Sequence, residues 1–465
     1  MTVNQKTTTT AQGITPIESR AAISLASIFS LRMLGLFLIL PVFALYAEEL
    51  VGVTPVLVGL AIGAYGLTQA LLQIPFGMLS DRIGRKPVII GGLLIFALGS
   101  VVAAQADTIW GVIIGRAIQG SGAIAAAVMA LAADLTQEHN RIKVMAVIGM
   151  SIGAAFALSL ILGPIINVWI GVKGIFWLTA VLALIGVVIA VFLVPDPKKS
   201  VFHRDTEPVP SQFARVLANP DLLRLNLGIL VLHMCLTAVF LVLPLALRDT
   251  AGLESADHWK IYFPVLMLSV VFMIPFVVVA ESRRKMKRVF LLSIALMAVA
   301  QLAFYAFFQS LWGVAFALLL YFTAFNVLEA TLPSLVAKMA PVESKGTAMG
   351  VYSTSQFGGA FLGGLTGGWI HNHFGLAAVF LFAAAAISIW LLVASGMPEP
   401  KYLNSHLLRI GTIDAAQARE LEARLLALDG VGEAVVVADE ETAYLKIDPK
   451  LIDMAALDEF SDARG

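Results

Sequence analysis

Residues 77–86 read Gly-Met-Leu-Ser-Asp-Arg-Ile-Gly-Arg-Lys and lie between two long apolar stretches. The segment places an Asp, two Arg and a Lys at the point where one membrane span would hand over to the next. Gly84 permits a tight turn there, because glycine adopts backbone conformations that a side chain forbids. The stretch therefore indicates a charged hinge between two transmembrane helices.

The composition around this hinge is that of an integral membrane protein. Of the 465 residues, 59% are hydrophobic and 13% are charged, whereas soluble globular proteins carry about 25% charged residues. The formal net charge of zero says little about partners, since the position of charges along a membrane protein matters more than their sum. The single cysteine, Cys235, excludes an internal disulfide and a cysteine-based metal cluster.

Twelve stretches are apolar enough to cross a bilayer, which takes about 20 residues. They begin near Ala21, Thr54, Pro87, Thr108, Ile142, Gly174, Leu225, Trp259, Val289, Leu311, Thr347 and Phe374. If the N-terminus is cytoplasmic, the outward loops hold only Lys173, Arg248 and Lys260 of the 31 basic residues. Cytoplasmic loops of membrane proteins are enriched in Lys and Arg, so this asymmetry places both termini in the cytoplasm.

The chain divides into five parts. We expect a disordered cytoplasmic N-terminus over 1–20, a six-helix half over 21–194, a cytoplasmic linker over 195–224, a second six-helix half over 225–396 and a soluble domain over 397–465. The linker divides the spans six and six, and the basic loop Glu281–Lys287 occupies the place that corresponds to the charged hinge. Both features favour an all-α membrane body of two pseudo-symmetric halves.

The C-terminal tail has the composition of a small soluble domain. We predict a strand over Tyr402–Ile410, a helix capped by Thr412, a hairpin of Glu433–Ala438 with Thr442–Ile447, and a short helix from about Leu451. This βαββα order is most of a ferredoxin-like unit. Its one imidazole, His406, does not make a metal site, so we expect a regulatory or interaction module whose ligand or partner the sequence does not name.

Four ionisable side chains lie deep within the predicted spans: Arg32, Arg116, His233 and Glu329. Each is by default a functional candidate, because a charge in the hydrocarbon zone costs several kcal/mol unless it faces a cavity or a partner. Glu329, with Asn326 three residues earlier on the same helical face, is the predicted proton carrier; the alternative is that it pairs with an Arg or His to hold two helices together. His233 either relays the proton or is a hydrogen-bonded packing residue.

The two buried arginines keep their protons. Arg32 and Arg116 therefore either pair with a carboxylate, attract an anionic substrate, influence a neighbouring acid or serve a structural role. Gln119 lies one turn beyond Arg116, and further polar side chains that either line the same cavity or bridge helices are Gln69, Gln73 and Gln356.

The hinge decapeptide resembles motif A of the major facilitator superfamily, in the loop after the second span. Two further segments agree with this resemblance: Gly115–Gly122, which reads Gly-Arg-Ala-Ile-Gln-Gly-Ser-Gly, is similar to motif B, and Gly163-Pro164 is similar to part of the antiporter motif C. Leu40-Pro41 in the first span is similar to the drug-efflux branch. Together with a ferredoxin-like C-terminal domain, the chain resembles the twelve-span, YajR-like type of drug:proton antiporter.

The resemblance implies a conformational switch built from motif A. It assigns Asp81 and Arg85 to the switch, with Asp134 as the partner of Arg85, and the remaining motif residues are Gly77, Arg82, Gly84 and Lys86. An Asp81 that faces the N-terminus of the eleventh span, near Gly346–Gly350, would gain up to about 1 kcal/mol from the helix dipole. We expect this contact to act as a latch for the outward-open state.

Several drug-efflux relatives carry an acid in the first span, where this chain has Arg32. This difference favours a neutral, lipophilic or anionic substrate over a simple cationic drug. We expect an inner-membrane transporter, a monomer without cofactor, that exports a small amphipathic compound or drug in exchange for protons. The alternatives are a proton-linked symporter or facilitator for a sugar or organic acid, and a membrane sensor that signals through its C-terminal domain.

Enzymatic and nucleic-acid-binding functions have little support in the sequence. We find no nucleophile–base pair and no phosphate loop. The tail lacks a basic aromatic face, since acids such as Asp439, Glu440 and Glu441 offset its bases. The expected partners are a small-molecule substrate, protons and membrane lipid.

Overall fold

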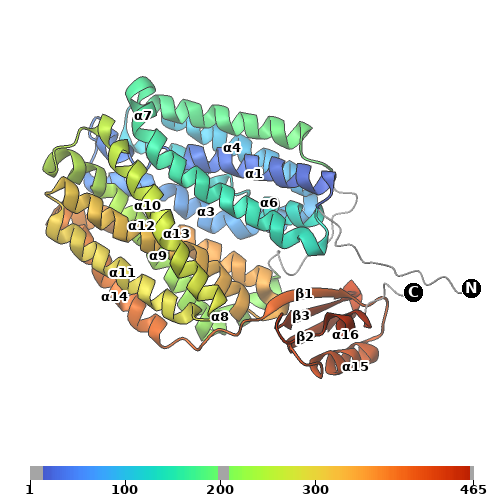
Figure 1. Ribbon diagram of the computed structural model, residues 1–465. Helices are drawn as coiled ribbons and strands as arrows, with labels where there is room; N and C mark the ends of the chain where they lie inside the picture. The colour runs from blue at the N-terminus through green and yellow to red at the C-terminus, as the bar shows by residue number, and fades with distance from the viewer. Residues whose placement is uncertain (1–13, 197–208, 461–465) are drawn as a thin grey trace, which may run out of the picture.

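The computed structural model describes residues 14–196 and 209–460, and it shows a bundle of long helices with a small α/β domain at one end (Figure 1). Segments 1–13 and 197–208, parts of the predicted N-terminal tail and linker, lie outside the described residues. The first half of the body comprises α1 Pro16–Phe37, α2 Phe43–Ala47, α3 Pro55–Ile83, α4 Arg85–Gln105, α5 Ile109–Ser121, α6 Ala125–Asp134 and α7 Glu138–Phe192.

The second half begins after a short helical lead-in and continues to Ser395. The lead-in consists of η1 Pro210–Gln212 and α8 Phe213–Ala218. The half itself comprises α9 Pro220–Leu245, η2 Ala246–Thr250, η3 Ser255–Asp257, α10 Trp259–Ser282, α11 Met286–Phe307, α12 Leu311–Met339, η4 Val342–Ser344, α13 Lys345–Phe374 and α14 Leu376–Ser395.

The helices agree with the predicted number of spans. Ten helical stretches of the described residues are long and apolar enough to cross a membrane. One of them, Lys143–Phe192, contains two spans, because α7 folds back at Gly171, where φ is +67°. The 30-residue α13 is absent from those ten because glycine, serine and threonine dilute its apolar residues. The second span of α7 and the helix α13 bring the count for the described residues to the predicted twelve.

The predicted fourth span is not one continuous helix. It is divided into α5 and α6, with Gly122 between them. The break lies where the chain packs backbone against backbone, since a Cβ on Gly122 would collide with the carbonyl oxygen of Gly92 in α4. The freed Gly122 carbonyl accepts a hydrogen bond from Arg32, as described below. Sequence hydropathy does not show this break, because residues 120–127 are all apolar or small.

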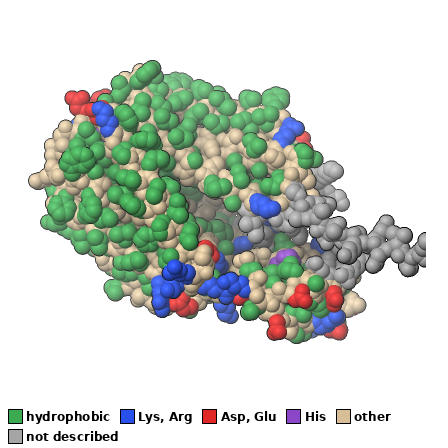
Figure 2. All heavy atoms as spheres, viewed as in Figure 1, with side chains coloured by type: hydrophobic (Ala, Val, Ile, Leu, Met, Phe, Trp, Pro, Cys, Tyr) green, Lys and Arg blue, Asp and Glu red, His purple; other side chains and the backbone are tan. Residues whose placement is uncertain are grey.

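The outer surface of the body is apolar. Large hydrophobic side chains such as Trp169, Phe272 and Leu392 are exposed, and Figure 2 shows hydrophobic side chains over most of the visible face. Blue Lys and Arg side chains gather near the C-terminal domain in the same view. An apolar exterior bounded by basic loops suits a helix bundle surrounded by lipid, and the predicted membrane fold class is confirmed.

The C-terminal domain is a three-stranded antiparallel sheet covered by two helices. Its elements are β1 Asn404–Arg409, α15 Ala415–Leu426, β2 Val431–Val437, η5 Ala438–Glu440, β3 Thr442–Ile447 and α16 Met454–Asp458, with strand order β1-β3-β2. A separate apolar core includes Leu408, Leu425 and Leu445. The predicted βαββα order is confirmed.

The predicted cap of α15 is wrong by two residues. Asp414, not Thr412, is the N-cap residue, and its side chain accepts hydrogen bonds from the backbone N–H groups of Ala416 and Gln417. Gln417 returns the contact by accepting from the Asp414 N–H at 2.9 Å. The hydroxyl of Thr412 instead donates to Glu441 at 2.6 Å. Asp and Thr are both good N-caps, and the Gln at the third helical position selects Asp414 by completing a capping box.

Candidate functional site

Three helices of the second half bring Glu329, His233 and Gln356 together. The Gln356 Nε2 of α13 donates to the Glu329 Oε1 of α12 at 3.2 Å and lies 2.9 Å from the His233 Nε2 of α9. Gln356 thus bridges the predicted proton carrier and the predicted relay. The second carboxylate oxygen, Glu329 Oε2, is buried and meets no hydrogen-bond partner among the described residues. We call these three residues the acid cluster.

Asn326 does not join the acid cluster. Its side-chain amide donates to the Ser269 hydroxyl of α10 at 3.1 Å, so it holds α12 against α10. Its neighbour Phe325 lies 6.0 Å from the His233 ring and, across the body, stacks on Phe156 of α7 at 6.0 Å. An aromatic contact between the two halves therefore borders the acid cluster.

The first half holds a separate basic cluster around Arg32 and Arg116. Arg32 is fully buried, and its Nη2 donates to Gln69 Oε1 and to the Gly122 carbonyl oxygen, each at 2.9 Å. Gln69 is positioned in turn by Gln73, because the Gln69 Nε2 donates to the Gln73 Oε1 at 2.7 Å. The guanidinium carbon of Arg32 lies 5.3 Å from the ring centre of Phe96.

Arg116 is oriented in a similar way by Gln119. The Arg116 Nη1 donates to Gln119 Oε1 at 2.9 Å, and the Gln119 amide donates to the Ser100 hydroxyl at 2.7 Å. The Tyr65 ring lies between both arginines, with its centre 5.8 Å from the Arg32 guanidinium carbon and 5.2 Å from that of Arg116. Two buried cations therefore share one aromatic ring.

Tyr65 was not among the residues selected from the sequence. It lies four residues before Gln69 and eight before Gln73, so the three share one face of α3. That spacing was a usable signal. From the sequence alone, however, a tyrosine near polar side chains indicates only ordinary helix packing. The structure shows that its ring contacts two guanidinium groups.

The motif A residues form an ion-pair network at the end of the body near the C-terminal domain. Arg85 is buried and pairs with Asp81, while its Nε lies 3.5 Å from Asp134 Oδ2 and its Nη1 donates to Ser80 at 2.9 Å. Gly84 has a φ of +98°, which joins α3 to α4 in a conformation that favours glycine. Arg85 thus contacts both acids that the sequence assigned to the switch.

The other motif A residues lie around this network. Gly77 faces α6, where an added Cβ would lie 3.1 Å from the Ala126 Cβ. Arg82 is exposed at the end of α3. Lys86 pairs with Asp196 at 2.6 Å. In this conformation the described partner of Asp81 is Arg85, so the predicted contact between Asp81 and the start of α13 stays a prediction for another conformation.

The two halves pack tightly at the opposite end of the body. At that end, a Cβ added to Gly59 of α3 would collide with the Gly364 oxygen of α13, and one added to Gly368 would lie 2.5 Å from the Pro55 oxygen. Gly63 and Gly66 continue this close packing toward the middle of α3. An ion pair links the same end, because Arg248 Nη1 lies 2.8 Å from Glu48 Oε2. Figure 2 shows a hollow in the visible face, above the C-terminal domain. The body is therefore closed at the end away from that domain.

Gly163 and Pro164 lie within the first span of α7. An added Cβ on Gly163 would lie 2.6 Å from the Leu38 carbonyl oxygen and 2.8 Å from Pro41 Cγ. The glycine thus lets α7 approach the turn that follows α1, which includes the Leu40-Pro41 pair. This places the partial motif C at a helix contact within the first half.

The C-terminal domain docks on the cytoplasmic ends of α10 to α13. Arg284 Nη2 lies 2.7 Å from Asp448 Oδ1, and the guanidinium holds the pKa of this carboxyl below its usual value. Lys446 donates to the carbonyl oxygens of Lys338, at 2.8 Å, and of Ala340. Burial lowers the pKa of the Lys446 ammonium. A cation at the C-terminal end of α12 complements the helix dipole.

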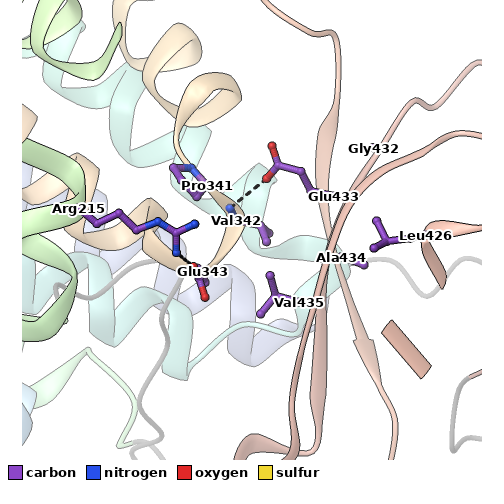
Figure 3. A pocket seen from close by; sticks show the side chains of 9 residues that line it. All are labelled: Arg215, Pro341, Val342, Glu343, Leu426, Gly432, Glu433, Ala434 and Val435. Atoms are coloured by element: carbon purple, nitrogen blue, oxygen red, sulfur yellow. Dashed lines mark hydrogen bonds and ion pairs between the residues drawn. The ribbon is translucent and has the colours of Figure 1, made fainter. Parts of the chain in front are cut away.

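A pocket of about 360 Å³ lies at this joint (Figure 3). Arg215 of α8 pairs with Glu343 of η4 on one wall, and the Glu433 carboxylate of β2 accepts from the Val342 N–H at 3.4 Å on the other. The Arg215–Glu343 pair lies within the body, whereas the Glu433 contact crosses from the body to the C-terminal domain. Of these two contacts, the hydrogen bond to Glu433 is therefore the one that joins the two walls.

Comparisons with known proteins cover both parts of the chain. A family model described as Major Facilitator Superfamily matches residues 25–363 and 265–407, and one described as YajR YAM domain matches residues 408–461. The inner membrane transport protein YajR of Escherichia coli (strain K12) is 49% identical over 438 residues, which cover 94% of this chain and 96% of that protein. The multidrug resistance protein MdtH of Yersinia enterocolitica is 26% identical over 350 residues, 74% of this chain and 84% of that protein.

Solved structures show the same fold at low identity. A bacterial homologue of the human lysosomal transporter Spinster has a TM-score of 0.69 at 13% identity, covering 83% of this chain and 98% of that one. The human organic anion transporter MFSD10 has a TM-score of 0.62 at 20% identity, covering 82% and 100%.

Proposed function

This chain belongs to the Major Facilitator Superfamily of membrane transporters, and from that premise we propose that it exports a small amphipathic compound in exchange for protons. The proposal treats the acid cluster as the proton site and the motif A network as the switch between two conformations. The transported compound crosses by alternating access, in which the two halves close first at one end and then at the other. As a transporter of the inner membrane it is not an enzyme.

The single observation that carries the proton assignment is the position of Glu329. Its Oε2 is buried without a partner while its Oε1 accepts one hydrogen bond from a neutral amide. Among the described residues no cation forms an ion pair with this carboxylate and holds it ionised, so the group is free to take up a proton. Coupling of substrate transport to protons requires a group that gains a proton when the cavity opens to one side of the membrane and loses it when the cavity opens to the other.

The switch assignment follows from how Arg85 is shared. Arg85 pairs with Asp81 and Asp134 in a conformation closed at the end far from motif A. When the near end closes, Asp81 would move to the start of α13, where the helix dipole favours a negative charge. The membrane field supplies about 2.3 kcal/mol per charge per 100 mV, which is enough to bias such a contact.

The test is efflux of a panel of dyes and drugs from pump-deficient bacterial cells that express the chain, with and without a protonophore. We expect efflux that the protonophore abolishes and that Asp81→Asn reduces at least about tenfold, because the switch loses a charge that it needs in both states. Lys450→Gln, an exposed change in the C-terminal domain, is the matched control and keeps wild-type efflux.

Two outcomes would contradict the proposal. Efflux unaffected by the protonophore would remove proton exchange. Accumulation of substrate with protons, in place of efflux, would assign the chain to the proton-linked symporters, since the direction of proton movement relative to substrate separates the two classes.

A further inference from the structure

Two buried guanidinium groups in the first half lack a carboxylate partner. Neither Arg32 nor Arg116 has an acid within ion-pair distance among the described residues. Arg32 Nε and Nη1 are buried and meet no hydrogen-bond acceptor there, and the Tyr65 hydroxyl beside them is in the same situation. Burying one cation without a counter-charge is costly, and this cluster buries two. A bound anion would supply the counter-charge that these two guanidinium groups lack.

The geometry points to a binding site for the anionic head group of an amphipathic compound, formed by Arg32, Arg116 and Tyr65. This inference rests on the proposed function, because it assigns a substrate class to the same transporter. Carboxylates and sulfonates suit the site, since planar guanidinium groups donate paired hydrogen bonds to such oxygens. The Tyr65 hydroxyl supplies a further donor.

The site is preorganised by amides that bear no charge. Gln69 fixes Arg32, and Gln119 fixes Arg116, each through a 2.9 Å hydrogen bond to the side-chain oxygen. A glutamine orients a guanidinium without neutralising it, so the positive charge stays available to a ligand. A carboxylate in either position would have satisfied the arginine permanently.

An apolar wall lies beside the charges. The ring centres of Tyr65 and Phe96 lie 6.4 Å apart in an edge-to-face arrangement, and the Arg32 guanidinium lies near both. An amphipathic anion would place its head group on the arginines and its apolar part against these rings. This combination discriminates against small inorganic anions, which gain nothing from the rings.

The cover of the site is a contact between the two halves. Tyr65 packs edge-on against Phe357 of α13 at 6.2 Å, and Phe357 follows Gln356, the bridge of the acid cluster. Movement of α13 that exposes the arginines would therefore also disturb the hydrogen bonds of Glu329. This shared helix gives a physical route by which anion binding and proton binding influence each other.

Binding by the purified full-length chain tests the site without any proton gradient. The probes share one ring system: 2-naphthoate, 2-naphthylmethanol and 2-naphthylmethylammonium, measured by calorimetry at constant pH. We expect the anion to bind at least about tenfold more tightly than the cation, and Arg32→Gln and Arg116→Gln each to weaken it by about tenfold or more. Arg32→Lys, which keeps the charge, should restore part of the affinity.

Arg283→Gln is the matched control, since it removes a cation from an exposed loop and should leave the affinity unchanged. Tyr65→Phe keeps the ring and its packing, and it should weaken naphthoate binding by about threefold to tenfold. This variant keeps the test decisive if the arginine variants fail to fold, which thermal unfolding of each variant will show.

Several results would overturn the site. Binding of the naphthylmethylammonium cation as tight as that of naphthoate, or tighter, would do so. So would a loss of naphthoate affinity in Arg283→Gln equal to that in Arg32→Gln, or saturable binding of chloride but not of naphthoate. The binding assay uses no proton gradient, so the two proposals can fail separately. Intact naphthoate binding without proton-coupled efflux would contradict proton exchange but not the anion site. Proton-driven efflux of cationic compounds without naphthoate binding counts against the anion site only.

Discussion

Glu329 is the residue whose chemistry is simplest to test. Replacing it with Gln keeps its size and its contact with Gln356 but removes the titrating group. We expect Glu329→Gln to fold and to bind ligand, yet to lose at least about tenfold of pH-gradient-driven transport. The measurement is uptake into proteoliposomes with an imposed pH gradient. Glu254→Gln, an exposed change at the end of the body away from the C-terminal domain, is the control. Unchanged proton coupling in Glu329→Gln would contradict the role of Glu329 as the proton carrier.

At this scale the sequence identified the charged residues and the glutamines near them, but not which glutamine contacts which charged group. Glu329, His233, Arg32 and Arg116 stand out because ionisable groups are rare in apolar spans. Their grouping into an acid cluster in one half and a basic cluster in the other depends on which helix faces meet. Hydropathy along one chain carries no information about that. Gln356 illustrates the limit, since its polarity was visible but its position between Glu329 and His233 was not.

Among the elements, α3 and α13 form the close crossing between the two halves. Gly63→Ala would place a Cβ 2.9 Å from the Phe361 backbone oxygen, so the helices must separate, at a cost of about 1–3 kcal/mol to this conformation. We expect a roughly fivefold or greater shift toward the conformation open at the end of the body away from the C-terminal domain. Spin labels at the exposed Val51 and Glu254 would report a longer distance.

The control for this change is Gly91→Ala in α4, where an added Cβ meets nothing within 4 Å. The label distance should then remain as in the parent chain. An unchanged distance in Gly63→Ala would show that the crossing yields without altering the state of the transporter. The sequence shows the glycines of α13 but not their register against α3, because a small residue specifies closeness without specifying a partner.

On the scale of the whole molecule, the C-terminal domain is attached to the second half through Arg284–Asp448 and Lys446. Because the Arg284 guanidinium lowers the pKa of Asp448 from its usual 3.8, this contact is fully present above pH 3.8 and is lost only as the pH falls through the lower, folded-state value. We therefore expect docking to be constant between about pH 5 and pH 8. Hydrogen exchange of the backbone amides around Arg284, corrected for the intrinsic pH dependence of amide exchange, measures docking over that range.

A matched pair of variants separates charge from packing in this joint. Asp448→Asn should raise exchange near Arg284 at every pH in the range, whereas Asp453→Asn, in the exposed segment before α16, should change only local exchange. Docking that weakens between pH 8 and pH 5 in the parent chain would mean that another group controls the joint. Composition and strand pattern predicted the domain itself, but a docking surface formed by loop ends far apart in sequence could not be predicted.

The attachment of this domain to the cytoplasmic ends of α10 to α13 has a mechanical consequence. A rigid body fixed to one half turns with it, and a point far from the axis of rotation travels further than a point near it. Small rearrangements around Glu329 and Tyr65 would thus become larger displacements of α15 in the cytosol. The domain would then amplify these movements, and a cytosolic partner bound to its exposed helix α15 would respond to the state of the transporter.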